Sequence, residues 1–400
     1  MMMKSKALLQ MKSALILIAF LVVLNEAGAQ KTLSIDDAFI SALENNLNIK
    51  VAENQTQIAA NNATKGNAGA LPTLSAGGSY SGSLTNTLLV FAGNAQPPIE
   101  VDGAQSATLA GNVTANYVLF NGFRAANSYE KLKTQESLAQ IQEQVQIESV
   151  VLAVANAYYV TLQIQNNLQA AESSLLISQR RLDRAKLRVE YGSANKIALL
   201  NAEVDLRNDS INVLTLKQQL LNAKNNLSYL IGQAGDSDFD IEKPFDLSLD
   251  LGRDELFEIA MKQNTSLLQA RQNLLLNEND IDISKSTLFP SLSLSTSYQY
   301  NSNQSDANFV IENRSAGLNG GISLNYSLFN GGAAKIQRQN AQLNWENQKL
   351  REEDLIRSLE TQVDNAFTNY TNSKAVYELR LKSLEVNELN FERSEELFKN

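Results

Sequence analysis

The side chains available for chemistry are limited, because the 400-residue sequence contains no Cys and no His. Thiolate nucleophiles, imidazole bases, disulfides and nearly all zinc or copper sites are therefore excluded. Only carboxylate or hydroxyl chemistry would remain for an enzyme, and the predicted strands and turns bring no pair of such groups together. We therefore predict that the chain is not an enzyme, with no catalytic, cofactor-binding or metal-binding residues.

Two further stretches have chemically suggestive residue types. Residues 331–335, Gly-Gly-Ala-Ala-Lys, lack the Gly-Lys-Ser/Thr spacing of a phosphate-binding loop, so a turn is the better interpretation. The acidic residues at 352–354 and at Glu385, Glu388 and Glu392 are most simply solvated helix faces, although some could line an enclosed space and make it negative. The net charge of −9 argues against nucleic acid as a partner.

The N-terminus has the pattern of a secretory signal peptide spanning residues 1–29. Three Lys precede the apolar run 14–24, and Ala27-Gly28-Ala29 supplies the small residues of a cleavage site before Gln30. The alternative, an inner-membrane anchor, is weaker, because this run is much shorter than the roughly 20 residues of a membrane span.

A sequence repeat organises the rest of the chain. The stretch Asn-Tyr-x-Leu-Phe-Asn-Gly begins at Asn116 and again at Asn325, 209 positions later. Earlier in each copy the matching offset is 218, so the second copy is shorter by nine residues in a loop. The earlier matches pair Leu33, Asp36, Phe39, Ala42 and Asn46 with Leu251, Asp254, Phe257, Ala260 and Asn264. We interpret the chain as two structural repeats.

Each repeat contains a predicted β-hairpin, at 71–121 and at 289–330. Pro72 and Pro290 stand at the strand openings, and the strands alternate apolar residues with uncharged polar ones. Such faces fit a membrane β-barrel with a wet lumen or a soluble sandwich, and the signal peptide and neighbouring helices favour the barrel. Four strands cannot close a barrel, so several chains must share it. Its aromatic girdle would include Tyr80, Tyr117, Tyr298 and Tyr326.

Long helices fill the remainder. Residues 30–70 and 251–288 are predicted as the first helix of each repeat, and 122–232 as a long antiparallel helical hairpin with its tip near 191–196. At this tip Gly192 suits a helix end, and Ser193 or Asn195 suits the cap of the next helix. Residues 233–250 are predicted as a linker. The second long helix, 331–400, is expected to lack its return helix, which the repeat would place up to about residue 441.

The ordered combination of these features resembles the TolC family of outer-membrane efflux proteins. The residues that carry the resemblance are Leu-Pro-Thr-Leu at Leu71, Phe-Pro-Ser-Leu at Phe289, and Leu-Phe-Asn-Gly at Leu119 and Leu328. Residues 184–192, followed by Ile197, are similar to the family's periplasmic tip. The resemblance covers nearly everything after Gln30.

This resemblance implies an α+β membrane protein that forms a homotrimer. Each chain would give four strands to a shared 12-stranded β-barrel in the outer membrane of a Gram-negative bacterium and long helices to a periplasmic α-barrel. The expected function is a passive exit duct of a tripartite efflux pump or type I secretion system, opened by an inner-membrane transporter and a periplasmic adaptor (membrane fusion) protein. Outer-membrane lipid would surround it. The alternative is a structural coiled-coil envelope protein without transport activity.

The candidate site residues follow from this resemblance. An acidic residue that many members have shortly after the tip Gly is absent, because Ala198 stands in the corresponding segment, and gate residues of the second repeat would lie beyond Asn400. The expected adaptor-contacting tip is Tyr191, Gly192, Ser193, Ala194, Asn195 and Lys196. The expected barrel-to-helix junctions are Phe120, Asn121 and Gly122, with Phe329, Asn330 and Gly331.

Overall fold

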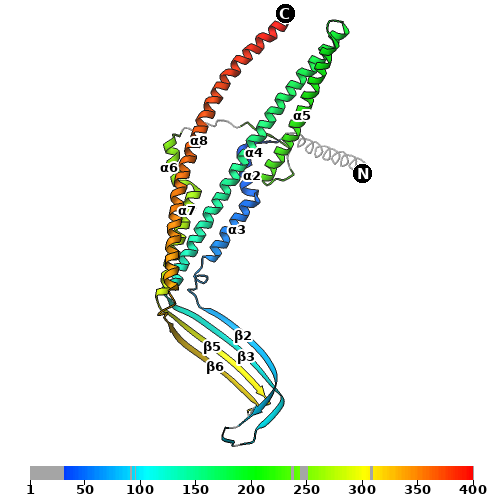
Figure 1. Ribbon diagram of the computed structural model, residues 1–400. Helices are drawn as coiled ribbons and strands as arrows, with labels where there is room; N and C mark the ends of the chain where they lie inside the picture. Colours follow the sequence, from blue (N-terminus) through cyan, green and yellow to red (C-terminus); the bar gives the residue numbers. More distant parts are fainter. Residues whose placement is uncertain are drawn as a thin grey trace, which may run out of the picture. The chain divides into compact units, whose positions relative to one another are not determined.

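A computed structural model describes residues 31–90, 92–94, 96–235, 238–243, 251–306 and 310–399 (Figure 1). The predicted signal peptide, with Ala29 and Gln30, therefore lies outside the described residues, as does part of the predicted linker 233–250. The chain divides into two units, which we describe separately. The first comprises residues 1–53 and 143–250, and the second comprises residues 54–142 and 251–400.

The second unit contains a four-stranded antiparallel sheet with the order β2-β3-β5-β6 (Figure 1). The two hairpins meet through β3 and β5, so β2 and β6 form the edges. Pro72 and Pro290 each directly precede a strand, where the missing N–H costs no ladder hydrogen bond. The strands are β2 (Thr73–Leu89), β3 (Ile99–Asn121), β5 (Ser291–Ser305) and β6 (Glu312–Asn325), with a 3-10 turn η1 (Ala92–Asn94) in the first hairpin.

The two faces of this sheet differ in chemistry. Cross-strand partners such as Tyr80 and Leu109, or Leu294 and Ile322, match apolar residues with apolar residues. On the opposite face Ser293 and Ser323 share a hydroxyl hydrogen bond of 2.8 Å. The apolar face is exposed in the single chain, since Tyr80 and Leu318 are each 75% exposed. The sheet thus presents an uncovered apolar surface backed by a hydroxyl-rich one.

The helices of the second unit pack beside one another through polar contacts. The Lys131 ammonium lies 2.5 Å from the Asp280 carboxylate, and the Arg253 Nε lies 2.7 Å from the Asp364 carboxylate. The Gln348 amide donates to the Ala270 carbonyl at 3.3 Å. The elements of this unit are the end of α3 (Leu47–Asn62), the start of α4 (Arg124–Glu190), α6 (Arg253–Gln263), α7 (Thr265–Lys285), the 3-10 turn η2 (Ser286–Leu288) and α8 (Ala333–Lys399).

The first unit has its own apolar core. Its elements are β1 (Lys31–Leu33), α2 (Ile35–Asn45), the start of α3, the remainder of α4, α5 (Lys196–Leu230) and β4 (Phe239–Ile241). Within this unit α4 and α5 run antiparallel to each other and meet at a turn (Figure 1). The fully buried side chains include Tyr158 and Val154 of α4 and Leu227 of α5. The core cluster consists of Ala38, Ala42, Ile49, Val150, Val154, Tyr158, Leu227, Ile231, Phe239 and Ile241.

Tyr158 anchors a small parallel sheet of β1 and β4 to this core. Its hydroxyl lies 3.0 Å from the Leu33 carbonyl and 2.7 Å from the Glu242 carbonyl, at the ends of the two strands. The Gln165 amide accepts from the Ile241 N–H at 3.1 Å and donates to the Ile241 carbonyl at 3.4 Å. A side chain therefore occupies the open edge of β4, in the place of another strand.

Several boundaries differ from the sequence expectations. The helix expected up to residue 70 is two helices, α2 and α3, because Asn46 is extended, and α3 ends at Asn62. The expected linker contains β4, which pairs with β1. The second hairpin, expected over 289–330, ends earlier, at Asn325, because Asn325 pairs with Ser291, the first residue of β5, and no pairing follows.

Helix α4 also meets the length and composition expected of a helix that crosses a membrane. It is the one helix of the described residues that does so. The buried Val150, Val154 and Tyr158 of α4 contribute to the core of the first unit. We therefore interpret its apolar stretch as a packing surface.

Candidate functional site

The predicted tip residues form the turn that joins α4 to α5. The turn is closed by the Arg188 carbonyl, which accepts hydrogen bonds from the Ser193 N–H at 2.8 Å, the Ser193 hydroxyl at 3.0 Å and the Ala194 N–H at 3.1 Å. Gly192 has a φ of 71°, a left-handed conformation that favours glycine. These three hydrogen bonds thus fix the path of the short turn between α4 and α5.

Asn195 and Lys196 begin the return helix. The Asn195 side chain accepts a hydrogen bond from the Ala198 N–H at 3.0 Å, which satisfies one free donor at the N-terminus of α5. Tyr191 is 81% exposed, and a Cβ at Gly192 would meet nothing within 4 Å. The turn is held by its own hydrogen bonds, and its surface is open.

The first strand-to-helix junction is tightly packed. Gly122 has a φ of 66°, and a Cβ there would lie 2.4 Å from the Ser286 carbonyl oxygen and 2.8 Å from the Phe289 Cβ. Phe123 follows with the same left-handed φ, which is strained for a bulky residue. Its ring contacts Phe120 and Phe289 edge to face, with centroids 5.3 Å and 6.0 Å away. These aromatic contacts, which our sequence analysis did not foresee, offset the strain.

The second junction is open. A Cβ at Gly331, which has a φ of 66°, would meet nothing within 4 Å, and Phe329 is 86% exposed. The two junctions share a capping interaction, because the Asn121 side chain accepts from the Ala125 N–H at 3.1 Å and the Asn330 side chain accepts from the Ala334 N–H at 3.4 Å. The repeated Asn therefore caps the helix that follows each strand.

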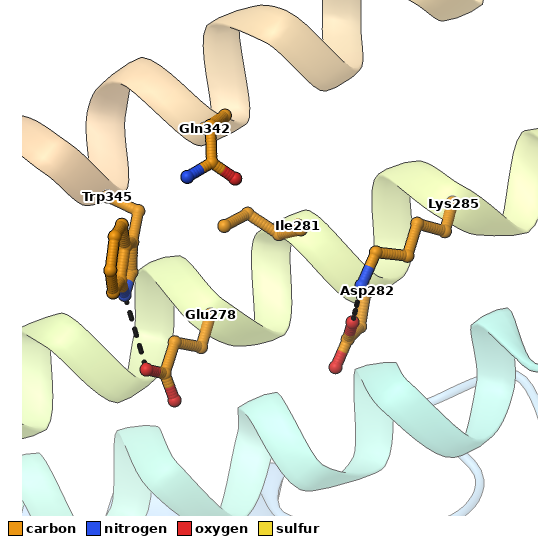
Figure 2. A pocket seen from close by; sticks show the side chains of 6 residues that line it. All are labelled: Glu278, Ile281, Asp282, Lys285, Gln342 and Trp345. Carbon is orange, nitrogen blue, oxygen red and sulfur yellow. Dashed lines mark hydrogen bonds and ion pairs between the residues drawn. The ribbon is translucent and has the colours of Figure 1, made fainter.

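A groove between α7 and α8 has a volume of about 340 Å³ (Figure 2). The Trp345 indole donates to the Glu278 carboxylate at 3.2 Å, and the Lys285 ammonium donates to the Asp282 carboxylate at 2.8 Å. Both carboxylates are thus already partnered by neighbouring side chains. The groove carries no charge left over for a ligand, and we interpret it as imperfect packing between two helices. Its lining is Glu278, Ile281, Asp282, Lys285, Gln342 and Trp345.

The described residues contain no group of three or more acidic side chains placed to hold a metal ion. The predicted sites do not form one cluster, because the tip lies in the first unit and the strand openings and junctions lie in the second. What the geometry offers is a set of structural turns, an exposed hairpin tip and an exposed apolar sheet face. Exposed apolar surfaces of this kind are typical of sites that contact other proteins or a membrane.

The sequence is also similar to those of known outer membrane proteins. A protein called outer membrane protein TolC from Vibrio cholerae is 28% identical over 161 residues, which are 40% of this chain and 37% of that protein. The Escherichia coli protein of the same name is 24% identical over 294 residues, which are 64% of this chain and 58% of that protein. The matched parts therefore span less than two thirds of these relatives.

The fold also has a counterpart among solved structures. The CmeC outer membrane channel of Campylobacter jejuni superposes with a TM-score of 0.64 at 16% identity, over 88% of this chain and 76% of that one. The family model of outer membrane efflux proteins matches residues 40–233 and 256–399, most of the chain. The predicted combination of long helices with an antiparallel sheet is confirmed, and the chain belongs to the outer membrane efflux protein family.

Proposed function

We propose that this outer-membrane protein is the passive exit duct of a tripartite efflux pump or type I secretion system. The observation that carries the proposal is the exposed apolar face of the β2-β3-β5-β6 sheet, in a chain of the outer membrane efflux protein family. An apolar surface of this extent does not stay in water on a monomer. Outer-membrane lipid would cover it.

The sheet also has two unpaired edges, β2 and β6. Backbone groups within lipid must be hydrogen-bonded, so an open sheet in a membrane has to close into a barrel. Four strands are too few, whereas a homotrimer would supply twelve. The hydroxyl-rich face would then line a wet lumen, and Tyr80 and Tyr298, which are 75% and 54% exposed, would contribute to an aromatic girdle.

The helices carry a second uncovered surface. On α5 the seven-residue series Ile197, Val204 and Ile211 is 64%, 55% and 61% exposed, so the described residues of the first unit leave this seam largely uncovered. Apolar seams at this spacing pack against other long helices. Helices of adjacent subunits would cover them and enclose a periplasmic tunnel.

The lengths and starting positions of the two longest helices support two structural repeats in the chain. Helices α4 and α8 each have 67 residues and begin at Arg124 and Ala333, which are 209 positions apart, as the repeated motifs are. Two structural repeats per chain, in a trimer, would give the tunnel six similar sectors. The predicted repeats, trimer and barrel are parts of this proposal.

The tip turn at 191–196 is the proposed contact with a periplasmic adaptor. It is exposed, its path is fixed by hydrogen bonds to the Arg188 carbonyl, and it ends the α4–α5 hairpin. An inner-membrane transporter would supply the energy, because the described residues contain no feature that could harness a nucleotide or a redox group. The duct itself would only open and close.

Export by a deletion strain tests the function. Loss of the gene should raise the retention of toxic hydrophobic dyes or of a secreted protein, and a plasmid copy should restore export. A contrary result would be a deletion strain that retains no more dye or secreted protein than wild type, although the plasmid-encoded protein reaches the envelope. In that case the alternative of a structural coiled-coil envelope protein would replace the duct.

A further inference from the structure

A stripe of basic side chains follows one face of α4 just before the tip. Arg180, Arg181, Arg184 and Arg188, here called the basic stripe, are all exposed. At the helical spacing of 100° per residue they fall within an arc of about 100°. Along the helix axis they extend over about 12 Å. The stripe therefore forms a ridge on the side of the hairpin, close to its end.

This charge is opposite to that of the chain as a whole. Residues 180–196 contain six Lys or Arg and two Asp or Glu, a net charge of +4, whereas the full sequence has a net charge of −9. The equivalent positions in the two repeats also differ. Residues 176–191 have five basic and two acidic side chains, and residues 385–400 have two basic and five acidic ones. Net charges of +3 and −3 show that the basic segment of the first repeat has no basic counterpart at the equivalent positions of the second.

Three of the four residues of the stripe make no ion pair with the described residues. Among the described residues, the ion pairs found do not include Arg180, Arg181 or Arg188. Beside the stripe, Leu187 is 51% exposed and Tyr191 is 81% exposed. Arg and Tyr beside a small apolar patch are the residue types enriched where proteins bind one another.

We propose that the basic stripe docks an acidic face of a periplasmic partner protein, with Leu187 and Tyr191 packing at the centre of the contact. This inference rests on the proposed function, because it gives the chemistry of the partner at the tip. A ridge of guanidinium groups favours carboxylates, which they bind in a bidentate manner. The acidic segment 385–400 would repel the same surface, so the partner would distinguish the two repeats.

An anionic membrane surface is the competing ligand. A flat bilayer would meet the turn at the end of the hairpin, whereas the stripe runs back along the side of α4 from Arg188 to Arg180. Asp183 and Glu190 lie beside the basic stripe on the same helix, and they would weaken attraction to a uniformly negative surface. A side-on protein surface with spaced carboxylates fits this arrangement better.

Photocrosslinking in the native host tests the proposal on the full chain. A photoreactive phenylalanine analogue replaces Leu187, and the crosslinked partner segment is identified by mass spectrometry. We expect a periplasmic protein segment rich in Asp and Glu. The triple variant R180E/R181E/R188E should lower the crosslink yield by about tenfold or more, because it places like charges in contact. Raising the ionic strength should also lower the yield.

Two matched variants serve as controls. R180K/R181K/R188K keeps the charge and should retain most of the crosslink, and E385K/E388K/E392K changes the same number of charges on α8 and should leave it unchanged. Equal amounts of assembled protein in the outer membrane show that the variants fold. An unchanged yield in the Glu variant, adducts to lipid alone, or a partner segment without excess acidic residues would overturn the proposal.

The export assay separates this inference from the proposed function. If deletion of the gene abolishes export while the Glu variant crosslinks and exports normally, the acidic partner is wrong and the duct stands. If deletion leaves export intact, the duct is wrong, whatever the crosslinks show.

Discussion

At the scale of single residues, Gly122 and Gly331 provide a comparison within one chain. Both have a φ of 66°, but a Cβ would clash with Ser286 and Phe289 only at Gly122. Gly331→Ala should therefore cost about 1–2 kcal/mol from the left-handed backbone alone. Gly122→Ala should cost clearly more. Thermal unfolding in detergent, followed by circular dichroism, measures the difference, and equal losses would refute the close packing of the first junction.

Tyr158 gives a prediction on alkaline pH. Burial raises the pKa of its phenol to about 12 from 10.0, with the nearby Glu242 carboxylate adding to the shift. The folded state therefore favours the neutral hydroxyl, so its contribution to stability is complete below pH 10 and is lost as the pH rises toward 12.

Tyr158→Phe should destabilise the first unit by about 1–3 kcal/mol at neutral pH, because the Leu33 and Glu242 carbonyls lose a buried donor. It should also weaken the dependence of stability on pH between 10 and 12. Unfolding midpoints across this range test it. Tyr159→Phe is the matched control, and a similar pH dependence in wild type and Tyr158→Phe would contradict the assignment.

At the scale of elements, added negative charge at the tip turn should impair export, because we propose that this turn contacts the adaptor. Ser193→Glu and Ala194→Glu alter the exposed surface of the turn, and we expect reduced export with an unchanged amount of assembled protein. Ser173→Glu places the same charge on an exposed position of α4 remote from the turn and should export normally. Normal export by both tip variants would remove the contact that we propose there.

The ion pairs between α6 and α8 should stabilise the protein less at acidic pH. Arg253 binds Asp364 at 2.7 Å and Glu360 at 3.3 Å, and the hydrogen bond from Arg253 holds the pKa of Asp364 below its ordinary value of 3.8. A lowered pKa means that this stabilisation exists above pH 3.8 and is lost as the pH falls further.

Arg253→Met should accordingly lower the thermal midpoint of the protein at neutral pH, by an amount that shrinks once Asp364 is protonated. Lys262→Met is a suitable control, because Lys262 pairs only at 3.7 Å with Glu258 of its own helix. A constant difference between Arg253→Met and wild type at neutral and acidic pH would show that the ion pairs contribute little.

The sequence was most informative where structure is local and periodic. Alternation predicted the strands around Leu294 and Tyr298, and the repeated Asn-Gly pairs marked both junctions. What it did not predict depends on contacts between distant segments. The three-residue strand β4 exists because β1 lies beside it and Gln165 covers its edge. The packing of Phe123 on Phe289, and the end of β6 at Asn325, likewise depend on partners far along the chain.

At the scale of the whole molecule, each unit has an apolar surface that its own described residues leave exposed. In the second unit it is one face of the sheet, where Leu74 and Leu324 are 76% and 70% exposed. In the first unit it is a helical seam that includes Ile211, which is 61% exposed. In the proposed trimer, lipid would cover the sheet face, helices of adjacent subunits would cover the seam, and their strands would pair with the edges β2 and β6.

The most direct test of this account is the mass of the complex that the full-length protein forms in its membrane. Outer and inner membranes are separated, the outer fraction is dissolved in mild detergent, and the complex is weighed by native mass spectrometry. We predict three chains per complex, recovered from the outer membrane. A soluble monomer or dimer, or a single chain in the detergent, would contradict the shared barrel and with it the proposed duct.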